Sequence, residues 1–415
     1  MAEAIIKEEQ PAIPVSFFSQ KKFMLLWGVT FCSAFSIAIF LFSQSWYIVK
    51  TLNMEASLGM VMIASSIPRL LFMAVGGVIA DRVSRTKILS VSNLTRSILL
   101  GGLLILLGSG EVSVYSFAVF GLVFGILDAF VWPANSALLP MLVEDSQLTR
   151  ANSIIQTTQQ ASMIIGPMIG GFLVSWGGYL FSFSVPAVML LCSAFLSRLI
   201  NLKPASTDSS GAPGIFASIK EGFSFVKTQP FLIALFISTI FINLSVVGPL
   251  MMGLPIFVKT ILHGSALDFS YMDGSMAAGM VVSSLIIGFL NVKRYRGMFA
   301  TAALFSMAAA LMLFSQTHFQ AGCMAVLFLI GMTFPATNIP ILSIFQQLVD
   351  RSMLGRLSGL LTMASLGLTP VSYAVTSFFL SNGVSITSIM FCGACSLLLV
   401  NLIVLWKLPV FRKTS

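Results

Sequence analysis

The sequence predicts an all-α protein that crosses a membrane twelve times, with its helices in two pseudo-symmetric six-helix bundles. Three observations predict this fold class. Of the 415 residues, 57% are hydrophobic and only 9% are charged, whereas soluble domains carry about 25% charged residues. Twelve apolar runs each approach the ~20 residues that a helix needs to span a bilayer. Short motifs of the first half also recur in the second half.

The predicted spans follow one another with short polar loops between them. They cover residues 24–48, 58–80, 88–108, 113–142, 153–176, 179–200, 231–258, 268–290, 298–315, 320–347, 357–380 and 384–407. A polar stretch containing Pro, Ser and Gly at 201–228 is predicted to be a cytoplasmic linker. It separates an N-terminal bundle at 1–200 from a C-terminal bundle at 229–415.

The basic residues orient the predicted spans. When the spans alternate across the membrane, 19 of the 23 Lys and Arg residues fall on one side, and only Lys50 and Lys259 fall on the other. The positive-inside rule then places both termini in the cytoplasm. The net charge of +9 is explained by this topology and by attraction to anionic lipids. No soluble face gathers these charges, so we expect no nucleic-acid partner.

The internal repeat is visible in three segments that recur in the same order, offset by 203 to 209 residues. A chance match of one segment is easy in a Leu-rich chain, but three in order are not. The matched segments are 49–51 with 258–260, 142–150 with 348–356, and 161–167 with 364–370. Parallel repeats of this kind predict two halves related by an axis along the membrane normal.

The loop after the second span carries one acid among several bases. Asp81 follows Gly77 by four residues, and Arg82, Arg85 and Lys87 come directly after it. This pattern resembles the loop between helices 2 and 3 of major facilitator superfamily transporters, with Ser84 where the second Gly is usual. The resemblance implies the major facilitator fold. It also implies that Gly77, Asp81, Arg82 and Arg85 act in gating at the inner ends of the bundles, with Asp81 near the start of span 11.

The fifth span carries a second family-like motif. Its Gly166, Pro167, Gly170 and Gly171 resemble the Gly-x-x-x-Gly-Pro-x-x-Gly-Gly pattern of the exporter branch, with Ser162 in place of the first Gly. Small residues at helical spacing allow helices to approach closely, and a proline bends a span. The resemblance implies that this site packs against the other bundle and limits leak.

A narrower resemblance lies around the end of the fourth span. The segment 132–140, together with 142–152 and Gly166-Pro167, is similar to the macrolide-efflux and enterobactin-exporter branch. The similarity covers most of the N-terminal half and is weaker in the second half, where the loop at 291–296 keeps its bases but lacks the Asp.

Few charged residues lie inside the spans, so each is a candidate for ion coupling. A charge at the bilayer centre costs roughly 2.5–3.5 kcal/mol even on insertion scales. By helical rise, Asp128 and Arg69 lie at similar depths and are expected to meet, whereas Arg96 lies shallower, with Ser92 and Asn93 on its face. Two interpretations of Asp128 are open: it forms a structural ion pair with Arg69, or it is a carboxylate that binds and releases a proton during transport. Asp273 is a second candidate proton carrier.

The family lines its central cavity with spans 1, 4, 7 and 10. In addition to Asp128, the candidates on those spans are Phe40, Gln44, Trp46, Trp132, Asn243 and Asn338. Such a wall suits a bulky amphipathic molecule. A macrolide-like drug and a siderophore both fit: a cavity-facing Arg69 favours an anionic siderophore, and Asp128 alone favours a neutral or cationic drug.

The expected function is secondary active export across the cytoplasmic membrane by proton antiport and alternating access. We expect a monomer whose partners are a small-molecule substrate, protons and lipids. The sequence has no phosphate-binding loop for ATP and no Ser/His/Asp set or metal cluster, so neither an enzyme nor a cofactor or metal is expected. Coupled uptake, or a membrane sensor that transports nothing, remains an alternative.

Overall fold

The computed structural model describes residues 20–144, 147–200, 230–290, 296–349 and 351–407. Every regular element in these residues is helical. The first half contains α1 (Lys21–Trp46), η2 (Tyr47–Thr51), α2 (Ser57–Arg82), α3 (Arg85–Ser109), α4 (Val114–Leu138), η3 (Leu139–Met141) and α5 (Leu148–Leu199). The second half contains α7 (Pro230–Ile242), η5 (Asn243–Val247), α8 (Gly248–Thr260), α9 (Ala266–Leu290), α10 (Arg296–Gln316), α11 (Gln320–Leu348), α12 (Arg351–Ser381) and α13 (Ile386–Lys407).

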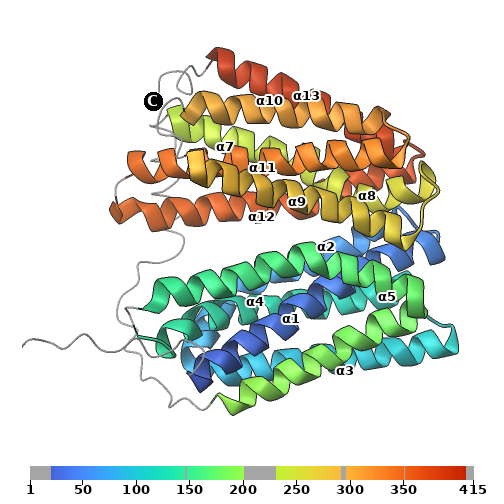
Figure 1. Ribbon diagram of the computed structural model, residues 1–415, viewed down its shortest axis with the longest axis vertical. Coiled ribbons are helices and arrows are strands. Elements are labelled where there is room, and N and C mark those ends of the chain that lie inside the picture. Colours follow the sequence, from blue (N-terminus) through green and yellow to red (C-terminus); the bar gives the residue numbers. More distant parts are fainter. Residues whose placement is uncertain (1–19, 145–146, 201–229, 291–295, 350, 408–415) are drawn as a thin grey trace, which may run out of the picture.

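Helix α5 combines two of the predicted spans. It is 52 residues long and contains one non-helical residue, Gly178, with φ 67° and ψ −167°. The two arms of α5 run in opposite directions within the same bundle (Figure 1). Among the described residues, ten helices are long and apolar enough to cross a membrane, and α2 contributes a shorter apolar segment at Ser57–Met73. The count of twelve crossings and the cytoplasmic termini stay predictions.

The helix ends follow local sequence chemistry. Ser113 precedes α4 and accepts a hydrogen bond from the Ser116 amide, while the Ser116 hydroxyl accepts from the Ser113 amide, so two donors at the helix start are satisfied. Gly110 ends α3 with φ 74°, a left-handed conformation that glycine adopts without steric cost. These caps set where each helix begins and ends, and therefore the depth of its polar residues.

The two halves fold as two bundles, one above the other in Figure 1. Similar contacts recur in both. The Gly125 backbone in α4 packs against the Ser65 backbone in α2, and Gly331 in α11 packs against the Met276 backbone in α9. Arg85 donates to the Ala137 carbonyl at 3.2 Å, and Arg296 donates to Ser343 Oγ at 2.9 Å. The repeat detected in the sequence is thus accompanied by a repeat of structure.

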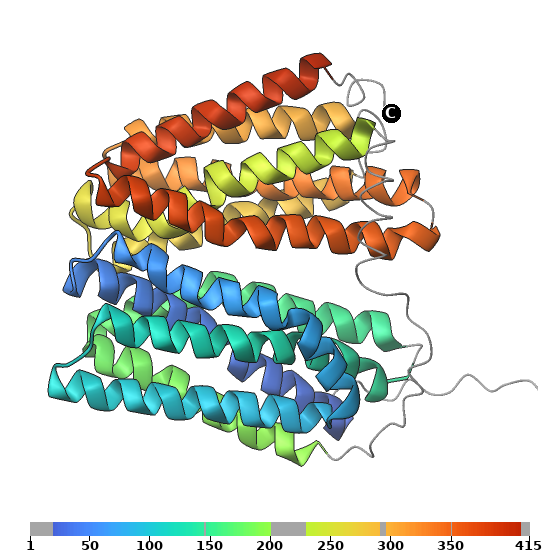
Figure 2. The same cartoon turned by 180° about the vertical axis from the view of Figure 1, so that it is seen from behind.

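The apolar core is shared at one end of the molecule and divided at the other. One cluster of buried side chains runs through both bundles and includes Phe42 and Phe269. Two further clusters are separate: one around Phe23 and Ala134 in the N-terminal bundle, and one around Phe231 in the C-terminal bundle. Figure 2 shows the same arrangement from behind, with the bundles meeting at one end and separating toward the end where α1 begins and α13 finishes. We call the end at which the bundles meet the Glu55 end, and the end at which they separate the linker end.

Candidate transport site

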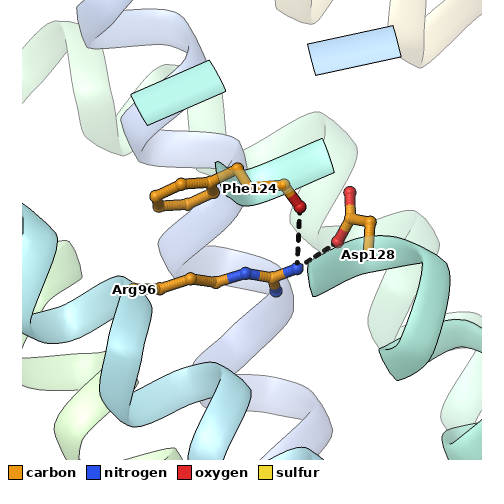
Figure 3. Close-up of polar contacts among 3 residues, drawn as sticks. All are labelled: Arg96, Phe124 and Asp128. Carbon is orange, nitrogen blue, oxygen red and sulfur yellow. Dashed lines mark hydrogen bonds and ion pairs between the residues drawn. The ribbon is translucent and has the colours of Figure 1, made fainter. Parts of the chain in front are cut away.

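An ion pair joins α3 and α4 inside the N-terminal bundle. Nη2 of Arg96 donates to Oδ1 of Asp128 and to the Phe124 carbonyl, the latter at 3.4 Å. The guanidinium carbon also lies 5.3 Å from the centre of the Phe124 ring. Figure 3 shows the three side chains, with the second Asp128 oxygen pointing away from the guanidinium. A carboxylate and its counter-charge therefore face each other within the bundle.

The two partners of this pair differ sharply in exposure. The Arg96 side chain is completely buried, whereas 36% of the Asp128 side chain is exposed. Nε and Nη1 of Arg96 are buried and have no hydrogen-bond partner among the described residues, and the same holds for Oδ1 of Asn93. The arginine is therefore fixed in the protein interior, while the carboxylate borders a more accessible space.

The helix bounds explain why Arg96 meets Asp128. Helix α3 begins at Arg85, so Arg96 lies 11 residues along it, ~16 Å from the linker end at ~1.5 Å per residue. Asp128 lies 10 residues before Leu138, so ~15 Å from the same end. The expected pairing of Asp128 with Arg69 is therefore wrong. It rested on a third span that started at residue 88, which made Arg96 too shallow.

Arg69 lies instead near the boundary with the other bundle. It sits close to the middle of α2 and is partly exposed. Helix α2 packs against α12 of the C-terminal bundle, the helix that carries Tyr373. In the part of the chain that the structure describes, Arg69 has neither a hydrogen bond nor a carboxylate partner.

The bundles are joined at the Glu55 end by polar, aromatic and close backbone contacts. Nζ of Lys259 lies 2.7 Å from Oε1 of Glu55. The rings of Phe42 and Phe269 stack with their centroids 4.4 Å apart. Ser377 of α12 donates to the Ala56 carbonyl at 2.5 Å. These contacts close the boundary between the bundles at this end.

A comparison with known protein families agrees with this architecture. A profile of the Major Facilitator Superfamily matches residues 26–373. The chain belongs to the major facilitator superfamily. This membership makes it a membrane transporter, and it confirms the family resemblance that the sequence motifs indicated.

The similar major facilitator proteins include exporters. Macrolide efflux protein A of Streptococcus pyogenes is 23% identical over 347 residues, which is 82% of this chain and 84% of that protein. Enterobactin exporter EntS of Salmonella paratyphi A is 25% identical over 351 residues, 82% of each chain. The crystal structure of the POT family transporter PepTSo matches with a TM-score of 0.74 at 11% identity, covering 95% of this chain and 99% of that one.

Asp273, the second candidate proton carrier, lies in α9 of the C-terminal bundle. Its side chain is partly buried, and within the described residues it makes no hydrogen bond or ion pair. The neighbouring Gly274 lies against Met168 of α5, so Asp273 stands close to the boundary between the bundles. A role in proton coupling stays a prediction.

The three candidate substrate residues of the first span are buried in this conformation. Phe40 stacks on Phe124 with their centroids 5.1 Å apart, and Trp46 stacks on Phe269 at 5.7 Å. Gln44 is only 5% exposed. Phe40 therefore belongs to the core around the ion pair. Trp46 belongs to the closed Glu55 end, so contact with a substrate requires that end to rearrange.

The candidate residues of the later spans are more accessible. Trp132 is 68% exposed, and Asn338 of α11 is also exposed. Asn243 begins the π-helical turn η5, and its Nδ2 donates to the Thr239 carbonyl at 2.9 Å. A π-turn of this kind often occurs at a functional site. Substrate contact by these residues stays a prediction.

The glycine motif of span 5 divides between two partners. A Cβ on Gly171 would stand 2.6 Å from Cβ of Ser270 in α9, so this glycine packs against the C-terminal bundle as expected. The expectation is wrong for Gly166 and Gly170, because these glycines face Ala38 and Phe42 of α1 in their own bundle. Pro167 is buried within α5. The spacing of the glycines correctly predicted a closely packed helix. Because successive residues on a helix are rotated by about 100°, Gly170 and Gly171 face different helices.

The loop motif can be followed only in part. Gly77, Asp81 and Arg82 lie in α2, but their side chains fall outside the described structure, as do those at the start of α12. Arg85 is described, and it ties the start of α3 to the Ala137 carbonyl at the end of α4. The gating role of this loop therefore stays a prediction.

Three features of the site were missed by sequence reasoning. They are the choice of Arg96 as counter-charge, the Glu55–Lys259 pair, and the contact between Gly59 and Ser377. A signal existed for the first, since Ser92, Asn93 and Arg96 share one polar face of an otherwise apolar helix. The other two depend on how the bundles dock, which a local pattern does not encode.

Proposed function

We propose that this protein exports a bulky amphipathic small molecule across the cytoplasmic membrane in exchange for protons. Asp128 is the first proton carrier of the cycle, and Arg96 is its counter-charge. Macrolide efflux protein A and enterobactin exporter EntS align with this chain over more than 80% of their own length. Their names support transport out of the cell. In this proposal the chain has twelve spans with both termini in the cytoplasm.

One observation carries the coupling role: a fully buried cation faces a carboxylate that is 36% exposed. When Asp128 is ionised, it neutralises Arg96, which cannot reach water. When Asp128 is protonated, Arg96 becomes an uncompensated buried charge, which is strongly unfavourable. Protonation therefore favours a conformation in which the guanidinium finds another partner. Nε and Nη1 of Arg96, which have no hydrogen-bond partner among the described residues, can donate to such a partner.

The arrangement of the cores supports alternating access. The bundles share one core at the Glu55 end and keep separate cores toward the linker end. We take this as the conformation that admits substrate from the cytoplasm. Movement of the bundles about the central site then opens the Glu55 end, in the rigid-body manner of such repeats.

Transport in proteoliposomes tests this function. Vesicles with an imposed pH gradient should accumulate a macrolide or a catecholate siderophore against its gradient, and an uncoupler should abolish the accumulation. Asp128→Asn should remove the gradient-driven component but leave downhill exchange measurable. Accumulation by Asp128→Asn that still collapses with an uncoupler would contradict the assignment of the carrier.

A matched variant separates coupling from structural support. If Asp128→Asn is lost from the membrane, the double variant Arg96→Gln with Asp128→Asn removes both charges and should restore the folded protein. If the folded double variant still accumulates substrate when driven by the proton gradient, then the Arg96–Asp128 pair supports the structure and does not carry the proton. In that case Asp273 becomes the carrier to test.

The substrate class has two candidates within this function. A macrolide-like drug and a siderophore are both bulky and amphipathic, and each corresponds to the name of one relative. Comparison of the growth medium of cells with and without the protein, by untargeted mass spectrometry, distinguishes a self-made siderophore from a foreign drug. It also tests coupled uptake, in which the compound disappears from the medium.

A further inference from the structure

Arg69 is a charge at mid-membrane depth that the ion pair does not use. It lies 12 residues after Ser57 and 13 before Arg82, so ~18 Å and ~20 Å from the two ends of α2. Asp128 is already matched by Arg96, which leaves Arg69 as the excess cation of the N-terminal bundle's described interior. Charged residues at this depth are costly and usually mark a substrate or ion path.

The contact between α2 and α12 lies on the Glu55 side of Arg69. A Cβ on Gly59 would stand 2.7 Å from Cβ of Ser377 and 3.0 Å from the Tyr373 carbonyl. Ser377 also donates to the Ala56 carbonyl. The two helices therefore touch directly over this stretch, and Arg69 follows on the linker side of the contact.

The side-chain directions bring Arg69 and Tyr373 toward the same space. Side chains on a helix tilt toward its first residue. Helix α2 begins at the Glu55 end, so Arg69 tilts toward the closed contact. Helix α12 ends there, so Tyr373 tilts away from it.

We propose that Arg69 and Tyr373 form a subsite for an acidic group, a carboxylate or a catecholate, on the transported molecule. A guanidinium presents two parallel donors that match a carboxylate, and the phenol adds a third donor from the opposite bundle. The inference rests on the proposed export function and deepens it. It selects an acidic substrate over a neutral or cationic one.

Asp273 is the rival partner for Arg69. It too lacks an ion pair among the described side chains, and a conformational change that joined the two residues would leave no cation for the substrate. An acidic ligand and Asp273 would then compete for Arg69, so the two explanations predict different effects of removing the Asp273 charge.

Binding to the purified full-length protein in detergent tests the subsite. The probes are 4-phenylbenzoate and its neutral amide, 4-phenylbenzamide, measured by calorimetry. The protein should bind the acid about tenfold more tightly than the amide, which corresponds to ~1.4 kcal/mol. Arg69→Gln should remove this preference, Arg69→Lys should keep part of it, and Tyr373→Phe should reduce it. Lys22→Gln, at an exposed cation of α1, should leave it unchanged.

Several results would overturn the subsite. These are equal binding of acid and amide, no measurable binding of the acid, or a preference that survives Arg69→Gln. Asp273→Asn should leave the preference for the acid over the amide unchanged or increase it less than twofold. A larger increase would show that Arg69 pairs with Asp273 and not with the ligand. Arg69→Gln should not lower the melting temperature, since Arg69 has no partner among the described residues. A marked fall would show that the Arg69 guanidinium stabilises the fold and does not serve the ligand.

The test is independent of proton coupling. Binding is measured without a membrane gradient, so an acid preference that depends on Arg69 stands even if the protein exports nothing. Conversely, proton-driven export of a neutral macrolide by Arg69→Gln as well as by the unmodified protein would keep the proposed function and reject the acidic subsite.

Discussion

Lys259 of α8 lies 2.7 Å from the Glu55 carboxylate and so joins the two bundles across their boundary. Both side chains are partly exposed, at 18% and 29%, so water screens the pair. An ion pair of this kind contributes about 0.2–1 kcal/mol. It therefore biases the conformational equilibrium without locking it, as a transporter that must open this end requires.

Glu55→Gln should shift the population toward the conformation that is open at the Glu55 end. The shift should be about 1.4- to 5-fold, the value that corresponds to the energy of a partly exposed pair. Spin-label distances between Met54 and Leu262 measure it directly. The charge reversal Glu55→Lys with Lys259→Glu should restore the original distribution. Unchanged distances in Glu55→Gln would mean that the pair does not hold this end closed.

Removing Asp128 and removing Arg96 should lower the free energy of unfolding by different amounts. Asp128→Asn leaves a fully buried guanidinium without its counter-charge, and loss of one partner of a buried pair costs about 3–5 kcal/mol. Arg96→Gln should cost less, because the Asp128 side chain that remains is 36% exposed. The free energy of unfolding in mixed micelles measures both. A larger loss for Arg96→Gln would contradict this account of the burial.

Gly171→Leu should open the contact between α5 and α9. The new side chain would overlap Ser270 and the Ala266 carbonyl, and overpacking of this kind costs about 1–3 kcal/mol. Since the strain falls between the bundles, the closed conformation should lose population and the substrate should leak. Gly102→Leu is the matched control, because nothing lies within 4 Å of a Cβ at Gly102.

Leu at Gly166 should have a different effect. A Cβ there would stand 2.5 Å from Cβ of Ala38, so the strain falls inside the N-terminal bundle. The protein should lose stability without a change in the distance between the bundles. If Gly166→Leu opened the Glu55 end as Gly171→Leu does, then the division of the motif between two partners would be wrong.

Much of the fold was predictable from the sequence, because burial in lipid leaves a strong local signal. Apolar runs located the helices, and the recurrence of residues 142–150 at 348–356 revealed the repeat. The partner of Asp128 was predicted wrongly despite the polar face around Arg96, because an error of three residues in the start of α3 shifts Arg96 by about 4.5 Å along the axis. The Glu55–Lys259 contact depends on docking between distant segments.

Asp273 gives the sharpest test of which carboxylate carries the proton. Because it has no described partner, Asp273→Asn removes an uncompensated charge and should leave the melting temperature equal or raised, unlike Asp128→Asn. If Asp128 alone couples transport to protons, Asp273→Asn should keep uphill accumulation and its sensitivity to uncouplers. Flux ratios at a series of imposed pH gradients measure the number of protons per substrate. A ratio that falls in Asp273→Asn while transport persists would show that the C-terminal bundle carries a second proton.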